Sequence, residues 1–367
     1  MKKYIILCLS LLFLLTACAP KSTPTPEVNE TSIPTSTPEP PAILPHSLYY
    51  LAEDATGAQQ IHRLERDGKT ITQITSEQGG VENFNISPTD DSIVYFSSNT
   101  ILIVDTNGEN PQILEENLLS NAAPIWSPDR KKIAYKLEKV AILYSLDNGE
   151  KESLFIDAEN EGSWFSSFSP DGNKIAFRKY TVPSAPGGSV YIYDLTQHSI
   201  TEFPRGKSCY NDVVLWASSE TLFCYGHSLA GGAMPGLFRM NAVDGSVETL
   251  IFSETMPPFL MVNAPRQDRE GNLYYLYTEI IDSANLLPAS SIEYFLVRSA
   301  TDGVTDRIKV REESFTPSRA IWTPDGNALL IIQEDELFFV PIDPSLPIFT
   351  IMDNTSKMDT YSLEWGQ

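Results

Sequence analysis

Four segments of the chain repeat one pattern, in which an aromatic or apolar residue precedes a turn sequence and a second apolar run. The copies are Ile86-Ser87-Pro88-Thr89, Trp126-Ser127-Pro128-Asp129, Phe168-Ser169-Pro170-Asp171-Gly172 and Trp322-Thr323-Pro324-Asp325-Gly326. In each copy the second run begins seven positions after the first residue, and weaker copies start at Trp216 and near Ala264. Proline fixes φ, aspartate hydrogen-bonds its own loop and glycine supplies positive φ, so every copy predicts a tight turn between two strands.

A second pair of short apolar segments follows each of these predicted hairpins. Residues 101–105 and 111–114 form one such pair, and residues 190–194 and 200–203 form another. Asn-Gly turns at 107–108 and 148–149 make tight connections of the kind found in β-hairpins. Each unit therefore contains four strands in about 40 residues, which is the signature of a propeller blade.

The repeat resembles the TolB-type repeat, a relative of the WD-type propeller repeat. The resemblance implies an all-β protein with a single β-propeller. It covers only the propeller half of that family, because nothing in the chain corresponds to the amino-terminal domain of TolB, so the partners of TolB are not carried over. The blades also resemble the propeller of prolyl-oligopeptidase-type enzymes, but no hydrolase domain follows the last predicted blade.

The number of blades follows from the markers of the first strand, which lie near residues 86, 126, 168, 216, 264 and 322. The first blade lacks such a marker, because residues 47–51 have the pattern of a second strand. Residues 361–365 have the pattern of a first strand and nothing follows them. Pairing of these two segments would close the ring and remove the open sheet edges. We expect seven four-stranded blades, with six or eight as the alternatives; the TolB resemblance alone implies six.

The amino terminus has the layout of a secretory signal. Lys2 and Lys3 precede an apolar run from Tyr4 to Leu15, which is short for a membrane span. Residues 15–18, Leu-Thr-Ala-Cys, match the lipobox of bacterial lipoproteins. This resemblance implies cleavage after Ala17 and acylation of Cys18, with an uncleaved anchor or an ordinary secretory signal as alternatives. We therefore expect a signal peptide at 1–17 and a protein held outside the cytoplasm, anchored to the cell membrane or the outer membrane.

Residues 18–46 are rich in proline, threonine, serine and glutamate and nearly free of aromatic residues. Such a composition cannot bury enough surface to offset its ordering entropy. We expect a disordered tether that separates the membrane from a propeller at 47–367; a proline-rich ligand for another domain is the alternative.

The formal net charge of −22 argues against polyanionic partners. Removing residues 1–17 takes away only the two lysines, so the mature chain would carry −24. Binding of nucleic acid or of anionic lipid headgroups requires clustered Lys and Arg, which argues against both as partners.

Long connections between the second and third strands are expected in three consecutive blades. They comprise residues 180–189, 226–236 and 279–293, and the links 205–212 and 255–265 lie on the same face of the predicted ring. Loops on a rigid scaffold commonly hold the function of a protein, and apolar patches mark binding sites. We hypothesise a recognition patch there, unless these loops only pack on one another. Its candidate residues are Tyr180, Tyr210, Met234, Phe259, Met261, Leu286 and Leu287.

Candidate chemistry is sparse elsewhere in the chain. Cys209 and Cys224 map to the same end of one predicted hairpin, so they are either a disulfide or two separate buried thiols. The four histidines have no zinc-site spacing, and no Gly-x-Ser-x-Gly or calcium-loop motif is present. We interpret Asp129, Asp171 and Asp325 as turn residues, and we predict no catalytic residue, no metal ligand and no cofactor.

These observations favour a non-enzymatic module that binds a protein, a peptide or a glycan. One alternative is a propeller hydrolase or lyase that uses an axial divalent cation such as calcium. A structural subunit of an envelope complex is the other alternative. All three depend on fold analogy, which is a weak guide to function.

Overall fold

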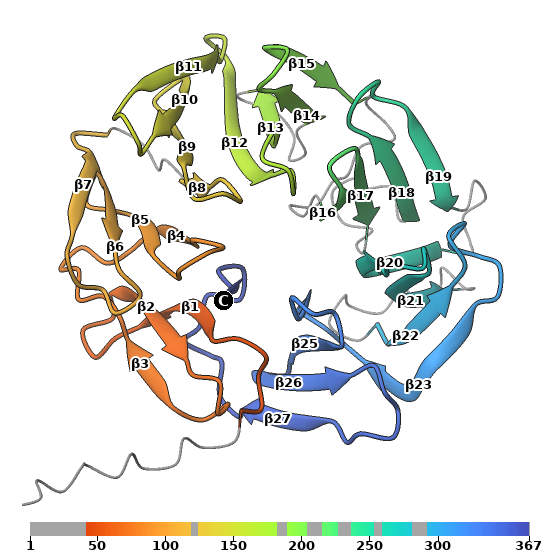
Figure 1. Ribbon diagram of the computed structural model, residues 1–367. Coiled ribbons are helices and arrows are strands. Elements are labelled where there is room, and N and C mark those ends of the chain that lie inside the picture. The colour runs from red at the N-terminus through yellow and green to blue at the C-terminus, as the bar shows by residue number, and fades with distance from the viewer. Residues whose placement is uncertain are drawn as a thin grey trace, which may run out of the picture. The chain divides into compact units, whose positions relative to one another are not determined.

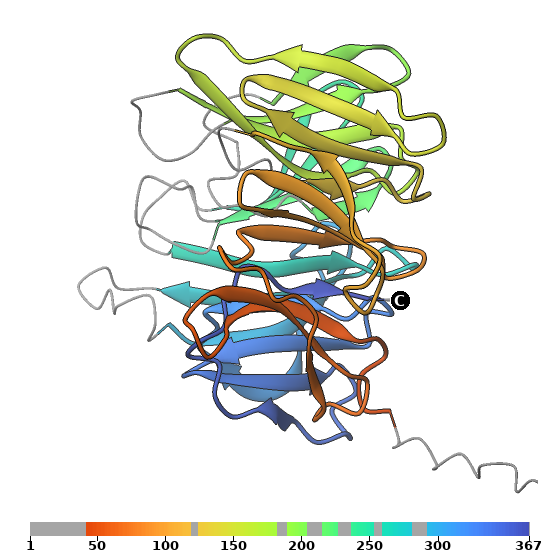
Figure 2. The same ribbon diagram turned by 90° about the vertical axis from the view of Figure 1, so that its left-hand side faces the viewer.

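A computed structural model describes residues 42–118, 124–181, 189–203, 215–226, 236–252, 259–280 and 292–366. These residues form seven four-stranded antiparallel sheets that are arranged around a common axis as a β-propeller (Figure 1). Seen from the side, the strands run across the ring between its two faces (Figure 2). The predicted fold class and the predicted count of seven blades are confirmed.

The strand bounds of the first four blades follow the predicted repeat. Blade 1 contains β28 (Glu364–Trp365), β1 (Leu48–Glu53), β2 (Gln59–Leu64) and β3 (Ile71–Gln73). Blade 2 contains β4 (Asn83–Ile86), β5 (Ile93–Ser97), β6 (Thr100–Val104) and β7 (Gln112–Glu115). Blade 3 contains β8 (Ile125–Trp126), β9 (Lys132–Leu137), β10 (Val140–Ser145) and β11 (Lys151–Ile156). Blade 4 contains β12 (Glu161–Phe168), β13 (Lys174–Thr181), β14 (Ser189–Asp194) and β15 (Ser199–Glu202).

The last three blades have the same order of strands from the axis outward. Blade 5 contains β16 (Leu215–Ser218), β17 (Thr221–Gly226), β18 (Gly236–Asn241) and β19 (Val247–Ile251). Blade 6 contains β20 (Phe259–Gln267), β21 (Leu273–Ile280), β22 (Tyr294–Ser299) and β23 (Ile308–Phe315). Blade 7 contains β24 (Arg319–Trp322), β25 (Ala328–Gln333), β26 (Glu336–Pro341) and β27 (Phe349–Met352).

The carboxyl-terminal strand closes the ring as predicted. In the register of β28 against β1, Leu48 lies opposite Trp365 and Tyr49 lies opposite Glu364. The Gly366 amide donates to the Ser47 carbonyl at 2.8 Å and extends the pairing beyond the strand. Blade 1 therefore takes its inner strand from one end of the chain and its other three strands from the other end.

Seven apolar clusters hold the described part of the ring together, one at each junction between neighbouring blades. The junction between blades 4 and 5, for example, packs Ile192 and Phe203 against Leu222 and Met240. Each sheet is thus buried on both faces, which explains why the second strands have nearly continuous apolar runs such as Ile93–Ser97. Leu44, only 1% exposed, joins the cluster between blades 7 and 1, so ordered packing begins before β1.

Tryptophans of the repeat also connect neighbouring inner strands by hydrogen bonds. The indole N–H of Trp365 donates to the Trp322 carbonyl at 2.8 Å, and that of Trp322 donates to the Ala264 carbonyl at 2.7 Å. The Trp216 indole donates to Ser167 Oγ at 3.1 Å. At these three positions the tryptophan both packs between blades and provides an N–H donor, whereas the indole nitrogen of Trp126 at the equivalent position is buried without a partner.

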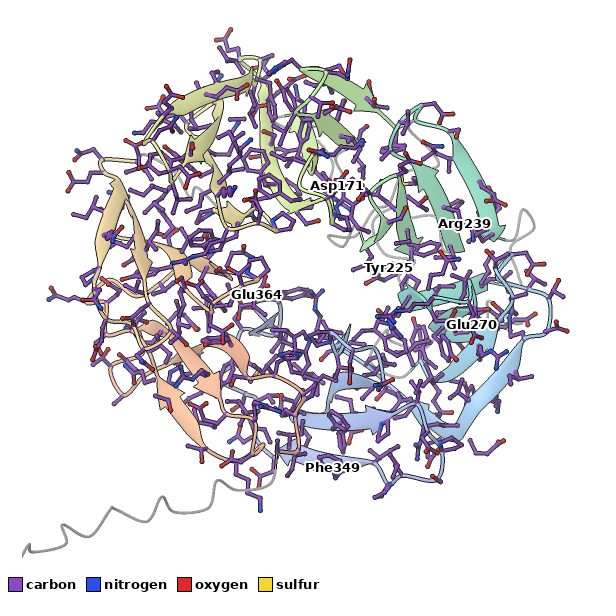
Figure 3. All side chains as sticks on the ribbon, viewed as in Figure 1. Asp171, Tyr225, Arg239, Glu270, Phe349 and Glu364 are labelled. Atoms are coloured by element: carbon purple, nitrogen blue, oxygen red, sulfur yellow. The ribbon has the colours of Figure 1, made fainter. Side chains whose placement is uncertain are left out.

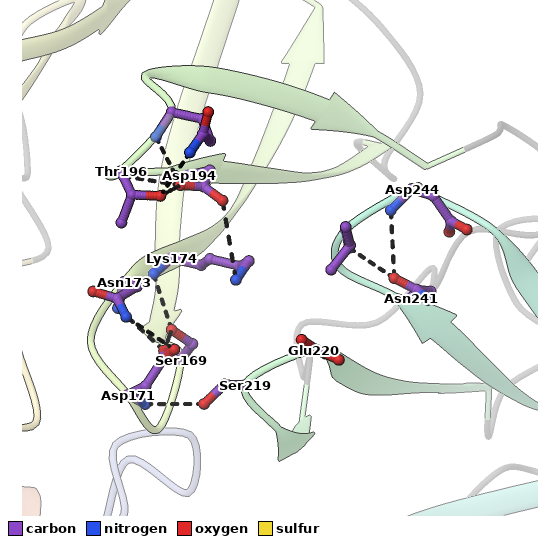
Figure 4. A network of polar contacts seen from close by, with 12 residues as sticks. Ser169, Asp171, Asn173, Lys174, Asp194, Thr196, Ser219, Glu220, Asn241 and Asp244 are labelled. Atoms are coloured by element: carbon purple, nitrogen blue, oxygen red, sulfur yellow. Dashed lines mark hydrogen bonds and ion pairs between the residues drawn. The ribbon is translucent and has the colours of Figure 1, made fainter.

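The Ser-Pro-Asp turns are structural, as the sequence indicates. In blade 4, Ser169 Oγ donates to Asp171 Oδ1 at 2.6 Å and accepts from the Lys174 amide at 2.9 Å (Figure 4). Burial acts to raise the pKa of Asp171, but hydrogen bonds from Ser169 and Asn173 outweigh it and hold the pKa below its usual value. The aspartate is therefore an ionised acceptor inside its own turn, and Asp129 and Asp325 occupy equivalent positions.

One boundary differs from the expectation. The link expected at 255–265 is shorter, because β20 begins at Phe259 and the residues from 259 to 265 lie in this strand. A bulge between Asn263 and Arg266 interrupts its register and obscures its period in the sequence. Among the described residues, no helix is long and apolar enough to cross a bilayer.

Candidate functional site

The inner strands of five blades line a cavity of about 490 Å³ beside the propeller axis. These strands are β4, β16, β20, β24 and β28, and the second strand β17 of blade 5 contributes two further aromatic residues. The positions arise from the fold, because the inner strand of every blade is the one that faces the axis. Residues as far apart in sequence as Ile86 and Trp365 therefore share one wall.

Aromatic side chains supply much of this wall. Trp216, Trp322 and Trp365 come from the repeat position that begins the turn, and Phe223 and Tyr225 come from β17. The three indoles are oriented by the hydrogen bonds described above. Fixed aromatic surfaces of this kind suit stacking against the apolar face of a sugar or the planar groups of a peptide.

Glu364 is the acidic group of the cavity. It lies on β28 close to the axis, where Figure 3 labels it, and its side chain is half-buried. Burial raises its pKa to about 7, although a hydrogen bond with the Asn85 side chain and the positive charge of Arg319 both act to lower it. A carboxyl group with such a pKa exists in both protonation states near neutral pH, so it can accept or donate a proton.

Two arginines line the same cavity and differ in their partners. Arg266 donates from Nη1 to the Gly326 carbonyl at 2.7 Å, and its guanidinium lies 5.5 Å from the centroid of the Trp322 ring. Gly326 has a φ of +69°, and a Cβ there would lie 1.6 Å from the Arg266 Cζ. The turn glycine is therefore needed both for its backbone conformation and for the space that the arginine occupies.

Arg319 begins β24, and its side chain makes neither a hydrogen bond nor an ion pair with any described residue; its Nε is fully buried and unsatisfied. Its nearest aromatic contact is the Tyr361 ring, whose centroid is 5.7 Å from Cζ. The cavity thus combines aromatic walls, a guanidinium and a carboxyl group that titrates near neutrality. This arrangement can bind a polar organic molecule and can exchange a proton with it.

The described residues contain no group of three or more His, Cys, Asp or Glu side chains placed to hold a metal ion. An axial divalent cation remains a prediction of the enzyme alternative.

A second charged cluster lies between blades 3 and 4. Lys136 Nζ is 2.7 Å from Asp157 Oδ2 and 3.0 Å from Ser163 Oγ, and the side chains of Lys136 and Asp157 are 5% and 1% exposed. Desolvation lowers the pKa of Lys136, and nearby Lys179 adds to this, while Asp157 opposes it. Because the ion pair is buried and closes the junction of two blades, we interpret it as structural.

The residues of the predicted recognition patch are only partly placed. Tyr180 is 37% exposed, stands 5.0 Å from Trp164 between ring centroids, and belongs to the end of β13. Met261 is fully buried in the cluster between blades 6 and 7, so it is not available on a surface, because it alternates into the core along β20. Phe259 lies at the start of β20. The remaining patch residues lie outside the described residues: Tyr210, Met234, Leu286 and Leu287.

The cysteines are also only partly described. Cys224 is fully buried on β17 and is disulfide-bonded. Its predicted partner Cys209 lies outside the described residues, as does Cys18. Pairing of Cys224 with Cys209 therefore stays a prediction.

The sequence-based reasoning missed Arg319 and Glu364. The available signal was a charged residue within each of two inner strands, Arg319 three positions before Trp322 and Glu364 directly before Trp365. A charged side chain in a strand of largely buried residues indicates either an oppositely charged or polar partner or a cavity beside the strand. Only the ring closure brings these two strands side by side.

Comparisons with known proteins identify a fold but no family. No family model matches the chain, and no curated protein is similar to it. Solved structures that match include a puromycin hydrolase, with a TM-score of 0.59 and 11% identity over 85% of this chain and 53% of that one. An oligogalacturonate lyase from Vibrio parahaemolyticus has a TM-score of 0.55 and 10% identity over 87% of both chains. A second structure of such a lyase, in complex with manganese, has a TM-score of 0.53.

TolB from Acinetobacter baumannii is also among the matches, with a TM-score of 0.44 and 17% identity over 87% of this chain. The chain spans 66% of that protein, which is less than two thirds of its length. At these identities the comparisons show the propeller fold alone.

Proposed function

We propose that this chain is a lipid-anchored, extracytoplasmic propeller that binds a small glycan or peptide ligand in its axial cavity. The observation that carries this proposal is the cavity of about 490 Å³ with fixed aromatic walls and charged groups of both signs. Small-molecule sites in proteins are about 300–1,000 Å³ and combine apolar walls with a few polar groups.

Three features support a ligand site over a packing defect. The cavity is lined by Trp216, Trp322 and Trp365, whose indole N–H groups already have partners, so the rings are fixed in place before a ligand binds. Arg319 and Glu364 place polar groups on the same wall. An unused cavity of this size would be expected to be filled by larger apolar side chains.

The anchoring part of the proposal depends on the lipobox at Cys18, and the tether at 18–46 would hold the propeller away from the membrane. The loop-rich face with Tyr180 is a second candidate surface, suited to a protein partner rather than to a small ligand.

One observation favours an enzyme as the second candidate function. Glu364, with its pKa raised to about 7 by burial, has the property required of a general acid or base at neutral pH. The oligogalacturonate lyase, of which this chain covers 87%, is an enzyme with a similar propeller fold. Turnover of a bound ligand that is abolished by Glu364→Gln, with binding retained, would favour the enzyme.

The experiment that tests the binding proposal fills the cavity. Ala217 lies on the cavity wall, and Ala217→Phe adds bulk inside it. Val243, exposed in an outer turn of the same blade, gives the matched control Val243→Phe. Purified residues 42–367 and both variants are titrated calorimetrically with a panel of mono- and disaccharides and capped dipeptides.

We expect at least one compound to bind the wild-type protein and the control equally and to bind Ala217→Phe at least about ten-fold more weakly. Equal binding to all three proteins would place the ligand elsewhere and refute the axial site.

A further inference from the structure

The guanidinium of Arg319 differs from those of Arg266 and Arg311, whose Nη groups donate hydrogen bonds to backbone carbonyls. Arg319 is half-buried and lines the axial cavity, and its Nε is buried with no hydrogen-bond acceptor among the described residues. No described ion pair includes it. Its one described ring contact is with Tyr361, whose centroid lies 5.7 Å from the Arg319 Cζ.

Arg311 is a buried arginine with a structural role, and although its Nε also lacks an acceptor, both of its Nη groups are held by the protein. Its Nη1 donates to the carbonyls of Pro341 and Asp343, both at 3.0 Å, and its Nη2 donates to the Leu346 carbonyl at 3.0 Å. Arg266, in the same cavity as Arg319, is likewise held by the Gly326 carbonyl. A buried donor that lacks an acceptor costs stability, so an unsatisfied guanidinium on a cavity wall indicates a function outside the fold.

Glu364 does not neutralise Arg319 by direct pairing. The two groups interact through space, but no ion pair within 4.0 Å joins them, and the Glu364 carboxyl is hydrogen-bonded to Asn85 instead. Because the pKa of Glu364 is about 7, a large fraction of this carboxyl is uncharged at neutral pH. The carboxylate of Glu364 therefore only partly offsets the two positive charges of Arg319 and Arg266 on the cavity wall, although the protein as a whole is strongly acidic.

We propose that Arg319 is the anchor for a carboxylate of the ligand in the axial cavity. This inference rests on the proposed function and names the chemical class of its ligand. The planar guanidinium can accept a carboxylate in the bidentate arrangement that arginine favours. Trp322 and Trp365 line the same cavity and would contact the remainder of the molecule. Uronic-acid sugars and peptide carboxyl termini share this chemistry.

Two matched pairs of probes separate the carboxylate from the rest of the ligand. D-glucuronate is compared with D-glucose, and N-acetyl-alanyl-alanine is compared with its carboxyl-terminal amide. Each is titrated calorimetrically into wild-type residues 42–367 at pH 7. We expect at least one acid to bind about ten-fold or more tightly than its neutral partner, because hydrogen bonds to charged groups contribute that much. Which acid binds identifies the source of the carboxylate.

Variants then assign the preference to Arg319. Arg319→Gln removes the charge, Arg319→Lys keeps the charge without the planar fork, and Arg298→Gln removes an exposed charge outside the cavity. Circular dichroism confirms that each variant is folded. We expect Arg319→Gln to abolish the preference for the acid, Arg319→Lys to reduce it, and Arg298→Gln to leave it unchanged.

The outcomes separate this inference from the proposed function. If neither acid binds better than its neutral partner, the anchor is refuted, even if Arg319→Gln cannot be purified. If neutral ligands bind in the cavity, as judged by their sensitivity to Ala217→Phe, the proposed function stands and the carboxylate anchor alone fails. If an acid binds with a preference that Arg319→Gln does not change, the carboxylate site lies elsewhere.

Discussion

Replacing Glu364 by glutamine should change how the stability of the propeller depends on pH. Glu364 lies on β28, opposite Tyr49, in the two-residue strand that closes the ring. Glutamine has nearly the same shape and can keep a hydrogen bond to Asn85, but it cannot ionise. The substitution therefore tests the energetic cost of a buried charge at the point where the two ends of the chain meet.

The magnitude follows from the displacement of the Glu364 pKa from 4.5 to about 7. At 1.36 kcal/mol per pKa unit this displacement corresponds to about 3 kcal/mol. The side chain borders a cavity and is only half-buried, and screening reduces the cost, so we expect about 1–3 kcal/mol.

Whether the ionisation of Glu364 stabilises or destabilises the protein depends on which state, folded or unfolded, binds the Glu364 proton more tightly. Burial raises the pKa of Glu364 in the folded protein, so the folded state retains a proton that the unfolded state has lost. The loss of folding stability caused by burying the ionised Glu364 carboxylate is absent below about pH 4.5, grows between pH 4.5 and 7 and stays constant above pH 7. Glu364→Gln should therefore match the wild-type protein at pH 4.5 and exceed its stability by about 1–3 kcal/mol at pH 8.

Urea unfolding at pH 4.5 and pH 8 measures this difference directly. Glu116→Gln, at an exposed glutamate after β7, is the control for loss of one negative charge. The reasoning fails if Glu364→Gln and the wild-type protein differ equally at both pH values, or if the variant is the less stable protein at pH 8.

Three further substitutions test other parts of the account. Trp365→Ala removes the apolar side chain and the indole donor of the closing strand, and it should lower the free energy of unfolding by about 3 kcal/mol in urea titrations at pH 7. Asp157→Asn leaves the buried Lys136 without its carboxylate and should cost about 3 kcal/mol, whereas the double variant Lys136→Met/Asp157→Asn should recover part of that loss in the same measurement. Cys18→Ala should move the full-length protein from the detergent phase to the aqueous phase in Triton X-114 partitioning, and retention in the detergent phase would contradict anchoring through Cys18.

The sequence predicted the fold because its strongest signals are local. Ser169, Asp171 and Gly172 specify a turn by their own side chains and backbone, independently of what surrounds them. The closure of the ring was also predictable, because residues 47–51 have the pattern of a second strand without a first one and residues 361–365 have the pattern of a first strand. Each of these inferences needs only the period of the repeat.

The axial site was not predictable for the opposite reason. Arg319 and Glu364 lie 45 positions apart, and their proximity depends on ring closure and on which inner-strand side chains turn toward the axis. Met261 of the apolar patch shows a related error, because the sequence predicts a loop residue there and the structure places it in the core on β20. A β-bulge interrupts the alternation of apolar and polar residues in that strand. Without that alternation, the sequence does not distinguish an apolar strand residue from an apolar loop residue.

The central claim, that the ligand binds in the axial cavity, is tested most directly by NMR of the five tryptophan indole N–H groups. Trp216, Trp322 and Trp365 line the cavity, whereas Trp126 does not and Trp164 lies beside Tyr180. Adding the tightest-binding acid probe to ¹⁵N-labelled protein should shift the signals of Trp216, Trp322 and Trp365 and leave those of Trp126 and Trp164 unchanged. A shift confined to Trp164 would contradict the claim, because it would place the ligand beside Tyr180 rather than at the axis.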